Sequence, residues 1–231
     1  YRMDGVKRNK EKMKLLLRSL ARNEATTVTN TSLARDVKEM DDTDLDKDTI
    51  ADYLDIFKRL FIIDNQMPFS TNIRSSVRIK QAEKRHFCDP SLACALLNAT
   101  PEMLVNDLQT LGFLFESLCE RDLKIYAESF GASLYHYQDY DNKEIDKKEQ
   151  WEYFVNIEID AVVELSNGEW CAFEIKLGAN QIDDAAKSLL DINKKIEKDP
   201  KGKPAKILCV ICGLSNAAYK RPDGVYVVPI T

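Results

Sequence analysis

Two short runs with a period of two, separated by Ser-Asn-Gly, constrain the fold of this chain more than any other feature. In residues 157–165 the odd positions are apolar, whereas the even positions hold three acidic residues and a valine. In residues 170–177 the odd positions are again apolar. Because successive side chains of a strand point to opposite faces, both runs predict β-strands. Asn-Gly between two such runs predicts a hairpin.

The length of the hairpin loop decides which side chains meet across the two strands. A two-residue loop, Asn167 and Gly168, would set apolar side chains opposite polar ones, since a shift of one residue moves a whole set to the other face. A three-residue loop, 166–168, keeps both faces consistent and needs a positive φ at Gly168. The expected pairs are then Asp160–Glu174, Glu158–Lys176, Ala161–Phe173 and Val163–Cys171.

Asp160, Glu174 and Lys176 form the candidate catalytic site. Carboxylates facing each other with Cβ atoms about 5 Å apart repel one another, and a cation between them would remove that repulsion. Oxygen ligands suit a hard cation such as Mg²⁺ or Mn²⁺. Such an ion would acidify a bound water above a phosphodiester, and Lys176 would stabilise the developing charge or steer the water. The alternative is an exposed hairpin face on which Glu158 and Lys176 form an ion pair that contributes about 0.2–1 kcal/mol.

The arrangement of Asp160 and Glu174-Ile175-Lys176 resembles the PD-(D/E)XK, or restriction endonuclease-like, nuclease core. The resemblance implies that Asp160 and Glu174 bind the metal and that Lys176 helps to orient the attacking water. It also implies that Glu116, on a strongly apolar predicted helix, is the helical acid that many members of that superfamily add to the metal cluster. The Pro-Asp pair of the superfamily's name is absent, because Ile159 precedes Asp160.

A second Glu-Ile-Asp, at residues 144–146, offers an alternative source for the first carboxylate. Asp146 lies 28 residues before Glu174, against 14 for Asp160, and the sequence KKEQ that follows it is not typical of a strand. Asp160 is therefore the better ligand. The segment 143–156 is expected to be an insertion at the rim of the site, where its aromatic residues Trp151, Tyr153 and Phe154 would contact a ligand or pack.

Residues 1–88 are expected to form a winged-helix-like domain. Amphipathic patterns predict helices over 9–21, 32–40 and 49–60, and the runs 61–64 and 76–80 predict two strands of a wing. The expected N-caps are Thr31 or Ser32 for the second helix and Asp48 or Thr49 for the third. The exposed face of the third helix mixes acidic with basic residues, which would meet phosphates poorly. A docking module is favoured over a sequence-specific DNA reader.

Residues 89–106 are expected to be a helical junction, with helices that start at Asp89-Pro90 and Thr100-Pro101. Residues 107–231 then predict a long helix over 108–130, the hairpin and its preceding strand, a helix beginning at Asp183 or Asp184, and strands at 205–213 and 224–230. This order is the one that the nuclease core requires. The expected fold class is α+β or α/β, with a restriction-endonuclease-like mixed sheet flanked by helices.

Over nearly its whole length the chain resembles the C-terminal region of a family of prokaryotic AAA-type ATPases. The phrases that carry the resemblance are DGVKRNKEKMKLLLRSLARN, KRHFCDPSLA, LGFLFESLCERDLKIYAESFG, EIDAVVELSNGEWCAFEIKLGANQID and DGVYVVPI. In that family an ATP-binding module precedes a winged helix and an uncharacterised nuclease-like domain. No GxxxxGK[ST] loop occurs in this chain, so ATP would act only through a module that the chain lacks.

Two function classes follow from the sequence. The first is a Mg²⁺- or Mn²⁺-dependent endonuclease domain governed by the AAA ATPase module, with nucleic acid, DNA above all, as its partner. The second is a catalytically inactive nuclease-fold module that binds nucleic acid or protein. A small-molecule enzyme has little support, because the chain has neither a glycine-rich cofactor loop nor a histidine-based nucleophile system.

Composition sets the remaining expectations. No run approaches 18 apolar residues and no leader is recognised, so we expect no membrane partner and a cytoplasmic location; an oligomer is compatible with the sequence. The six cysteines are expected to be reduced. Residues 1–85 carry 18 Lys and Arg against 14 Asp and Glu, whereas residues 86–231 carry 15 against 24. An acidic second half argues against tight, autonomous binding of nucleic acid, because phosphate contacts dominate such affinity.

Overall fold

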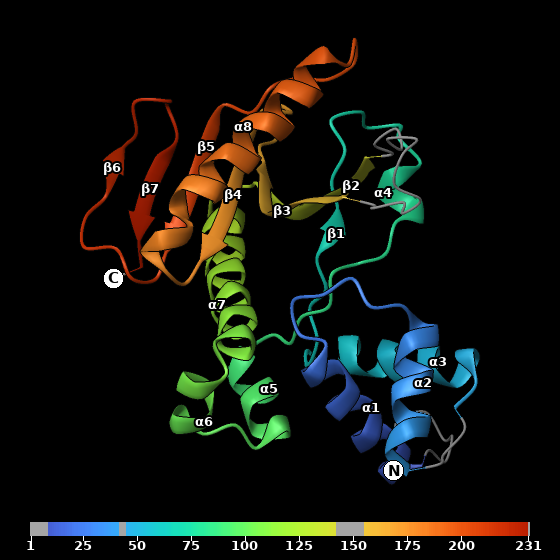
Figure 1. Cartoon of the computed structure of the whole chain (residues 1–231). Coiled ribbons are helices and arrows are strands. Elements are labelled where there is room, and N and C mark those ends of the chain that lie inside the picture. Colours follow the sequence, from blue (N-terminus) through green and yellow to red (C-terminus); the bar gives the residue numbers. More distant parts are fainter. Residues whose placement is uncertain (1–8, 42–44, 142–154, 231) are drawn as a thin grey trace, which may run out of the picture. The chain divides into compact units, whose positions relative to one another are not determined.

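A computed structural model describes residues 9–41, 45–141 and 155–230, which belong to two compact units (Figure 1). The first unit comprises Tyr1–Gln66 and Ala82–Arg121, and the second comprises Met67–Gln81 and Asp122–Thr231. The three domains expected from the sequence, residues 1–88, 89–106 and 107–231, are each one continuous segment of the chain. The compact units instead interleave, because residues 67–81 pack with the C-terminal part of the chain.

Helices dominate the first unit. They are α1 (Lys10–Arg22), α2 (Asn30–Asp41), α3 (Lys47–Arg59), α5 (Pro90–Leu97), α6 (Pro101–Asn106) and the start of α7 (Leu108–Ser129). The apolar stripes of α1, α2 and α3 meet in one core, which includes Leu16, Leu33, Ile50 and Phe57. The helix starts predicted at Asp89-Pro90 and Thr100-Pro101 are confirmed, since the side chains of Asp89 and Thr100 cap the backbone N–H groups of Ser91 and Met103.

The predicted N-caps of α2 and α3 were wrong by two to three residues. The Thr29 hydroxyl accepts the N–H of Ser32 at 3.2 Å, and Asp46 accepts the N–H of Thr49 at 2.7 Å. Several polar residues precede each of these helices, and any of them can cap a helix. Propensity alone therefore does not select among them.

The two strands predicted for a wing are not formed as expected. Residues 76–80 contain the short helix α4 (Val77–Lys80), and residues near 61–64 make only an isolated antiparallel bridge, Ile63 with Phe87. Alternation specifies a strand when one of its faces is buried, but Ile79 is 85% exposed. Two further isolated bridges, Gln66–Lys84 and Thr26–Arg85, complete the β-like pairing of the first unit among the described residues.

The second unit is built on a mixed seven-stranded sheet in the order β1-β2-β3-β4-β5-β7-β6. Its strands are β1 (Met67–Pro68), β2 (Ser133–Asp141), β3 (Val155–Glu164), β4 (Trp170–Lys176), β5 (Ile207–Cys212), β6 (Tyr219–Lys220) and β7 (Tyr226–Pro229). Strands β2, β3 and β4 are antiparallel neighbours, whereas β5 runs parallel to β4 and β7. The predicted class, helices with a mixed sheet, is confirmed. The order α7, three meandering strands, α8 and β5 is also as expected.

Helix α8 (Ile182–Lys198), which follows a short 3₁₀ turn (Ala179–Gln181), covers one face of this sheet and closes the main core of the unit. Its apolar stripe packs with residues from β3, β4, β5 and β7, among them Val162, Trp170, Val210 and Val227. A smaller cluster joins Ala127 of α7, Ala132 and Val163. Residues of β3 and β4 are thus held from several sides.

The predicted three-residue hairpin loop is confirmed. Backbone pairing joins Ala161 to Phe173 and Val163 to Cys171, and Gly168 has φ +78°. The N–H of Gly168 donates to the carbonyl of Leu165 at 2.9 Å, which closes the turn. A residue with a Cβ adopts this φ only with strain, so the Asn-Gly sequence fixes the register on which the site depends.

All six cysteines are free thiols. Cys209 and Cys212 are buried in β5, and burial raises the pKa of Cys209 to about 11. Within the described ranges, no helix combines the length and the apolar character that crossing a membrane would need.

Candidate active site

Asp160 lies at the point where strands β3 and β4 stop pairing through their backbones. The last backbone pair toward the N-terminus of β3 is Ala161–Phe173. Beyond it, the carboxylate of Asp160 accepts the N–H of Ile175 at 2.7 Å. The Asp160 side chain therefore accepts an N–H group of β4 where the backbone ladder has ended. Its carboxylate lies between the two strands.

A β-bulge in β3 explains how Asp160 is oriented. Tyr135 pairs with Val162 and Tyr137 pairs with Ile159, so Asp160 and Ala161 together lie opposite the single residue His136. The strict alternation expected over residues 157–165 is therefore wrong at this point: Ile159 packs in the same core cluster as Val162. Bulges are frequent beside active sites, where they redirect a side chain.

Lys176 joins the two carboxylates of the site. Its Nζ lies 3.0 Å from Oδ2 of Asp160 and 2.6 Å from Oε2 of Glu174. Burial disfavours the charged ammonium, but the two carboxylates outweigh this effect together, and the pKa of Lys176 is raised. The three predicted catalytic side chains thus converge on one point.

The burial of the two carboxylates is not typical of an exposed hairpin face with a surface ion pair, which was the alternative interpretation of the sequence. Asp160 is 7% exposed and Glu174 is 5% exposed, whereas the side chain of Lys176 retains 26% exposure. Buried carboxylates need a cation or hydrogen-bond donors. The site is therefore a compact, polar cluster inside the sheet with one side chain that reaches solvent.

The donor set fits a divalent cation with retained waters. Lys176 Nζ marks a position within about 3 Å of both carboxylates. Among the residues that the structure describes, no three His, Cys, Asp or Glu side chains gather closely enough to hold a metal ion by themselves. Mg²⁺ commonly uses one or two protein carboxylates and keeps several waters, so Asp160 and Glu174 are sufficient protein ligands for it.

Glu116, the predicted third acid, lies on the part of α7 that belongs to the first unit. Its carboxylate pairs with the ammonium of Lys84, a fully buried side chain. A carboxylate in apolar surroundings needs a cation or a hydrogen-bond donor as partner, and the partner of Glu116 is a lysine. A role for Glu116 in a shared metal site stays a prediction. Asp146 and the aromatic residues at 151–154 lie outside the described residues.

A buried charge network around Glu116 was not anticipated from the sequence. Lys84 Nζ lies 2.9 Å from Glu120, and Nε2 of His86 lies 3.1 Å from the same carboxyl group. Nδ1 of His86 lies 3.3 Å from Glu24. The available signal was the spacing of Glu116 and Glu120, which places both on one helix face. Nothing in the sequence indicated that Lys84, His86 and Glu24 would meet that face.

These observations define the second unit as an α+β domain with a carboxylate–lysine cluster where two central strands diverge. Residues 2–103 of the chain match a domain of unknown function (DUF8612), and residues 151–231 match another domain of unknown function (DUF4143). The second domain is commonly associated with ATPases. No curated protein and no solved structure matches the chain.

Proposed function

We propose that the second unit is a nuclease-like domain that hydrolyses phosphodiesters with the help of Mg²⁺ or Mn²⁺. The observation that carries this proposal is that Asp160 and Glu174, on adjacent strands, share one cationic partner within 3.0 Å. A divalent ion held there would activate a water molecule and offset negative charge on the phosphate.

Each of the three residues in the cluster then has a defined role. Asp160 and Glu174 supply the oxygen ligands, and the hydrogen bond from Ile175 fixes the carboxylate of Asp160. Lys176, the most exposed of the three, can turn its ammonium toward the phosphate and stabilise the charge that grows in the transition state. The surrounding sheet keeps these groups in place before substrate binds.

The order of elements supports a PD-(D/E)XK fold for this unit, with α7, the three meandering strands, α8 and β5 in the sequence that this fold requires. The packing of α1, α2 and α3 in one core supports a winged-helix-like docking module for the first unit. The association of the second domain with ATPases supports a AAA-type ATPase module as its partner and the source of ATP dependence. DNA is the substrate that we favour.

A second candidate function is that of a catalytically inactive nuclease-fold module. The observation that favours it is that Lys176 already neutralises both carboxylates without any added cation. In that case the cluster would hold the strands together and the domain would serve as a binding module for nucleic acid or protein.

The test is cleavage of plasmid, single-stranded and branched DNA with Mn²⁺ or Mg²⁺, combined with calorimetric titration of the metal. Glu174→Ala should reduce cleavage about 100-fold or more and abolish metal binding. Glu169→Ala is the matched control, because Glu169 lies on the same hairpin and pairs with Lys206 at 2.7 Å. Wild-type protein that neither binds the metal nor cuts any of these substrates would overturn the nuclease proposal and favour the second candidate.

A further inference from the structure

Two segments of the second unit hold nine of its 17 Lys and Arg residues but only two of its 19 Asp and Glu residues. Residues 67–81, called here the arm, contain three Lys and Arg and no acidic residue. Residues 194–206 contain six Lys against two acidic residues. The remainder of the unit has 8 Lys and Arg against 17 Asp and Glu. The second unit is therefore acidic as a whole, although it contains two strongly basic segments.

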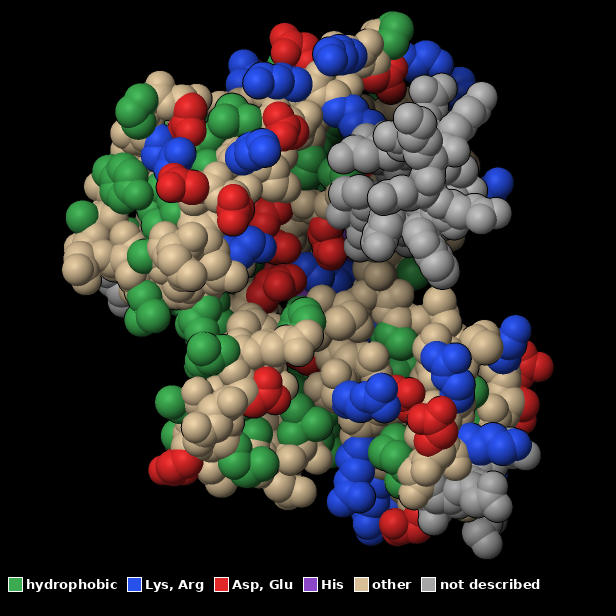
Figure 2. Space-filling model, viewed as in Figure 1, with side chains coloured by type: hydrophobic (Ala, Val, Ile, Leu, Met, Phe, Trp, Pro, Cys, Tyr) green, Lys and Arg blue, Asp and Glu red, His purple; other side chains and the backbone are tan. Residues whose placement is uncertain are grey.

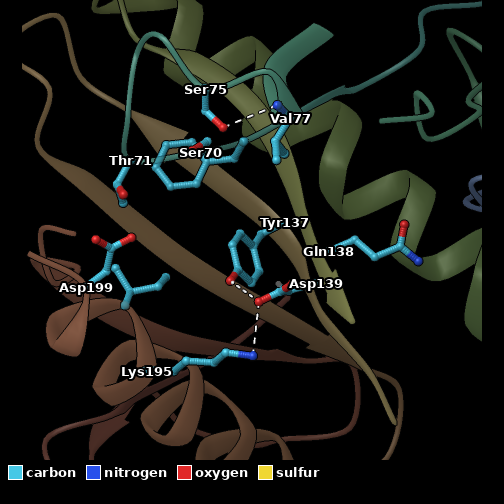
Figure 3. Close-up of a pocket in the computed structure, with 11 residues that line it drawn as sticks. Ser70, Thr71, Ser75, Val77, Tyr137, Gln138, Asp139, Lys195 and Asp199 are labelled. Carbon is cyan, nitrogen blue, oxygen red and sulfur yellow. Dashed lines mark hydrogen bonds and ion pairs between the residues drawn. The ribbon is translucent and has the colours of Figure 1, made fainter. Parts of the chain in front are cut away.

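The fold brings these two segments together around a pair of pockets. One pocket, of about 310 Å³, is lined by Ser70, Thr71 and Ser75 of the arm and by Lys195 and Asp199 at the end of α8. Figure 3 shows these side chains around the pocket, with Tyr137 and Asp139 of β2 beside Lys195.

The other pocket, of about 420 Å³, lies at the loop of the β3–β4 hairpin. It is lined by Thr71 and Arg78 of the arm, by Lys203, and by the turn residues 165–168. Since Thr71 lines both pockets, they adjoin along the arm. We call the two together the arm groove.

Two of the cations at the groove are neutralised locally. Arg78 makes a bidentate pair with Glu164, at 2.8 and 3.0 Å, and Lys195 pairs with Asp139 at 3.0 Å. Lys206, in the second segment, pairs with Glu169 at 2.7 Å. The other exposed cations of the two segments outnumber the exposed acids, Glu197 and Asp199, by six to two. They are Arg74, Lys80, Lys194, Lys198, Lys201 and Lys203. Figure 2 shows Lys and Arg side chains at the top of the view, where Figure 1 places the C-terminal end of α8.

The other side chains of the groove also suit a phosphate-bearing chain. Hydroxyl groups of Ser70, Thr71 and Ser75 can donate to phosphate and sugar oxygens. The ring of Tyr137 offers a surface on which a base can stack. Pockets of roughly 300–1,000 Å³ accommodate small organic ligands, so each part of the groove has room for about one nucleotide.

We propose that the arm groove binds the sugar–phosphate backbone of a single nucleic-acid strand. As a substrate-holding surface it rests on the proposed function, but binding itself needs neither the metal nor cleavage. The acidic balance of the C-terminal part, which argued against autonomous binding, is overcome locally because screening limits the reach of distant charges to about 10 Å.

Binding is measured on the full chain in EDTA, by fluorescence anisotropy with a labelled single strand of about 16 nucleotides and with the corresponding duplex. The test variant carries Lys198→Gln, Lys201→Gln and Lys203→Gln. The control variant carries Lys10→Gln, Arg35→Gln and Lys47→Gln, which removes the same charge from exposed positions of the first unit. Circular dichroism establishes that both variants are folded.

The wild-type chain should bind the single strand, and the test variant should bind it about tenfold or more weakly. Its slope of log affinity against log salt should be smaller by about 2, since each phosphate contact contributes roughly 0.7. The control variant should retain both values. Absence of wild-type binding, equal losses in both variants, or tighter binding of the duplex would each overturn the proposal. Binding in EDTA without any metal-dependent cleavage would instead support strand binding by the arm groove and contradict the proposed nuclease function.

Discussion

At the scale of single residues, Lys176 decides the electrostatic balance of the candidate site. Two carboxylates with side-chain exposures of 10% and 6% accept from its one ammonium group. Without that cation, Asp160 and Glu174 would face each other across a gap from which water is largely excluded, where charges interact more strongly than in bulk water. The lysine is therefore a structural counterion as well as a candidate catalytic group.

Lys176→Met should lower the free energy of unfolding by about 2–3 kcal/mol, because a buried pair loses one partner and leaves uncompensated charge. Added Mn²⁺ should restore part of this loss, since an ion bound only to the folded state stabilises it. Urea unfolding with and without Mn²⁺ measures both effects. Lys187→Met, at an exposed position of α8, is the control and should change little. An unchanged unfolding midpoint in Lys176→Met would contradict the role of counterion.

His86 is the second residue whose surroundings set a measurable property. Burial lowers the pKa of His86, and the nearby carboxylate of Glu24 offsets this only in part. In the unfolded chain the imidazole titrates near 6.5. Below that pH the unfolded state binds more protons than the folded state, so this contribution to stability is present above pH 6.5 and is lost as the pH falls.

We therefore expect the stability of the chain to drop between about pH 7 and pH 5 by up to about 1.4 kcal/mol per pH unit from this group. His86→Gln should flatten that part of the profile relative to the parent chain. Urea midpoints measured across this range provide the test. A variant profile as steep as the parent profile would show that other groups cause the pH dependence.

At the scale of elements, side-chain caps fix where helices begin more sharply than the apolar stripes do. The stripe of α3 is compatible with a start at several residues, yet Asp46 binds both the N–H and the hydroxyl of Thr49, at 2.7 and 2.9 Å. These bonds lower the pKa of Asp46. The cap selects one of several acidic residues that precede the helix.

Asp46→Ala should lower the melting temperature of the chain, because it removes the acceptor for an otherwise unpaired backbone N–H. Asp48→Ala, two residues later and inside the first helical turn, should have a smaller effect through the helix dipole alone. Differential scanning calorimetry of the two variants distinguishes them. A larger effect of Asp48→Ala than of Asp46→Ala would contradict Asp46 as the N-cap and favour Asp48, one of the two caps predicted from the sequence.

At the scale of the whole molecule, the arm belongs to a different unit from the residues that flank it in the sequence. It is attached to the second unit by β1–β2 pairing, by the Arg78–Glu164 pair and by the packing of Phe69. Phe69 is 1% exposed, and its ring centroid lies 5.0 Å from that of Trp170. A single aromatic side chain thus contributes much of the apolar burial that holds the arm in place.

Phe69→Ala should destabilise the second unit by about 3–5 kcal/mol, because it removes a large buried side chain from a packed core. It should also make the arm more susceptible to limited proteolysis, since cleavage follows local opening. Ile73→Ala, at a position that is 81% exposed in the same arm, is the control. Equal rates of cleavage in both variants would contradict the anchoring role of Phe69.

The elements whose patterns are local could be predicted from the amino-acid sequence. The Asn-Gly turn and the two alternating runs specify the hairpin and its register, since Gly168 supplies the positive φ and any slip would invert both faces. That register was enough to predict that Asp160, Glu174 and Lys176 lie close together. The strand and helix order of the second unit followed from periodicity and from Pro and Gly positions in the same way.

Features that depend on partners distant in sequence could not be predicted in this way, because they arise from long-range packing. The bulge at Asp160 arises from pairing with β2 around His136, and the partner of Glu116 is Lys84, 32 residues away. The helix at 77–80 replaces a predicted strand because the arm offers that segment no buried sheet face. The arm groove likewise requires residues 67–81 and 194–206 to meet, because the sign of a local charge patch depends on which segments the fold places side by side.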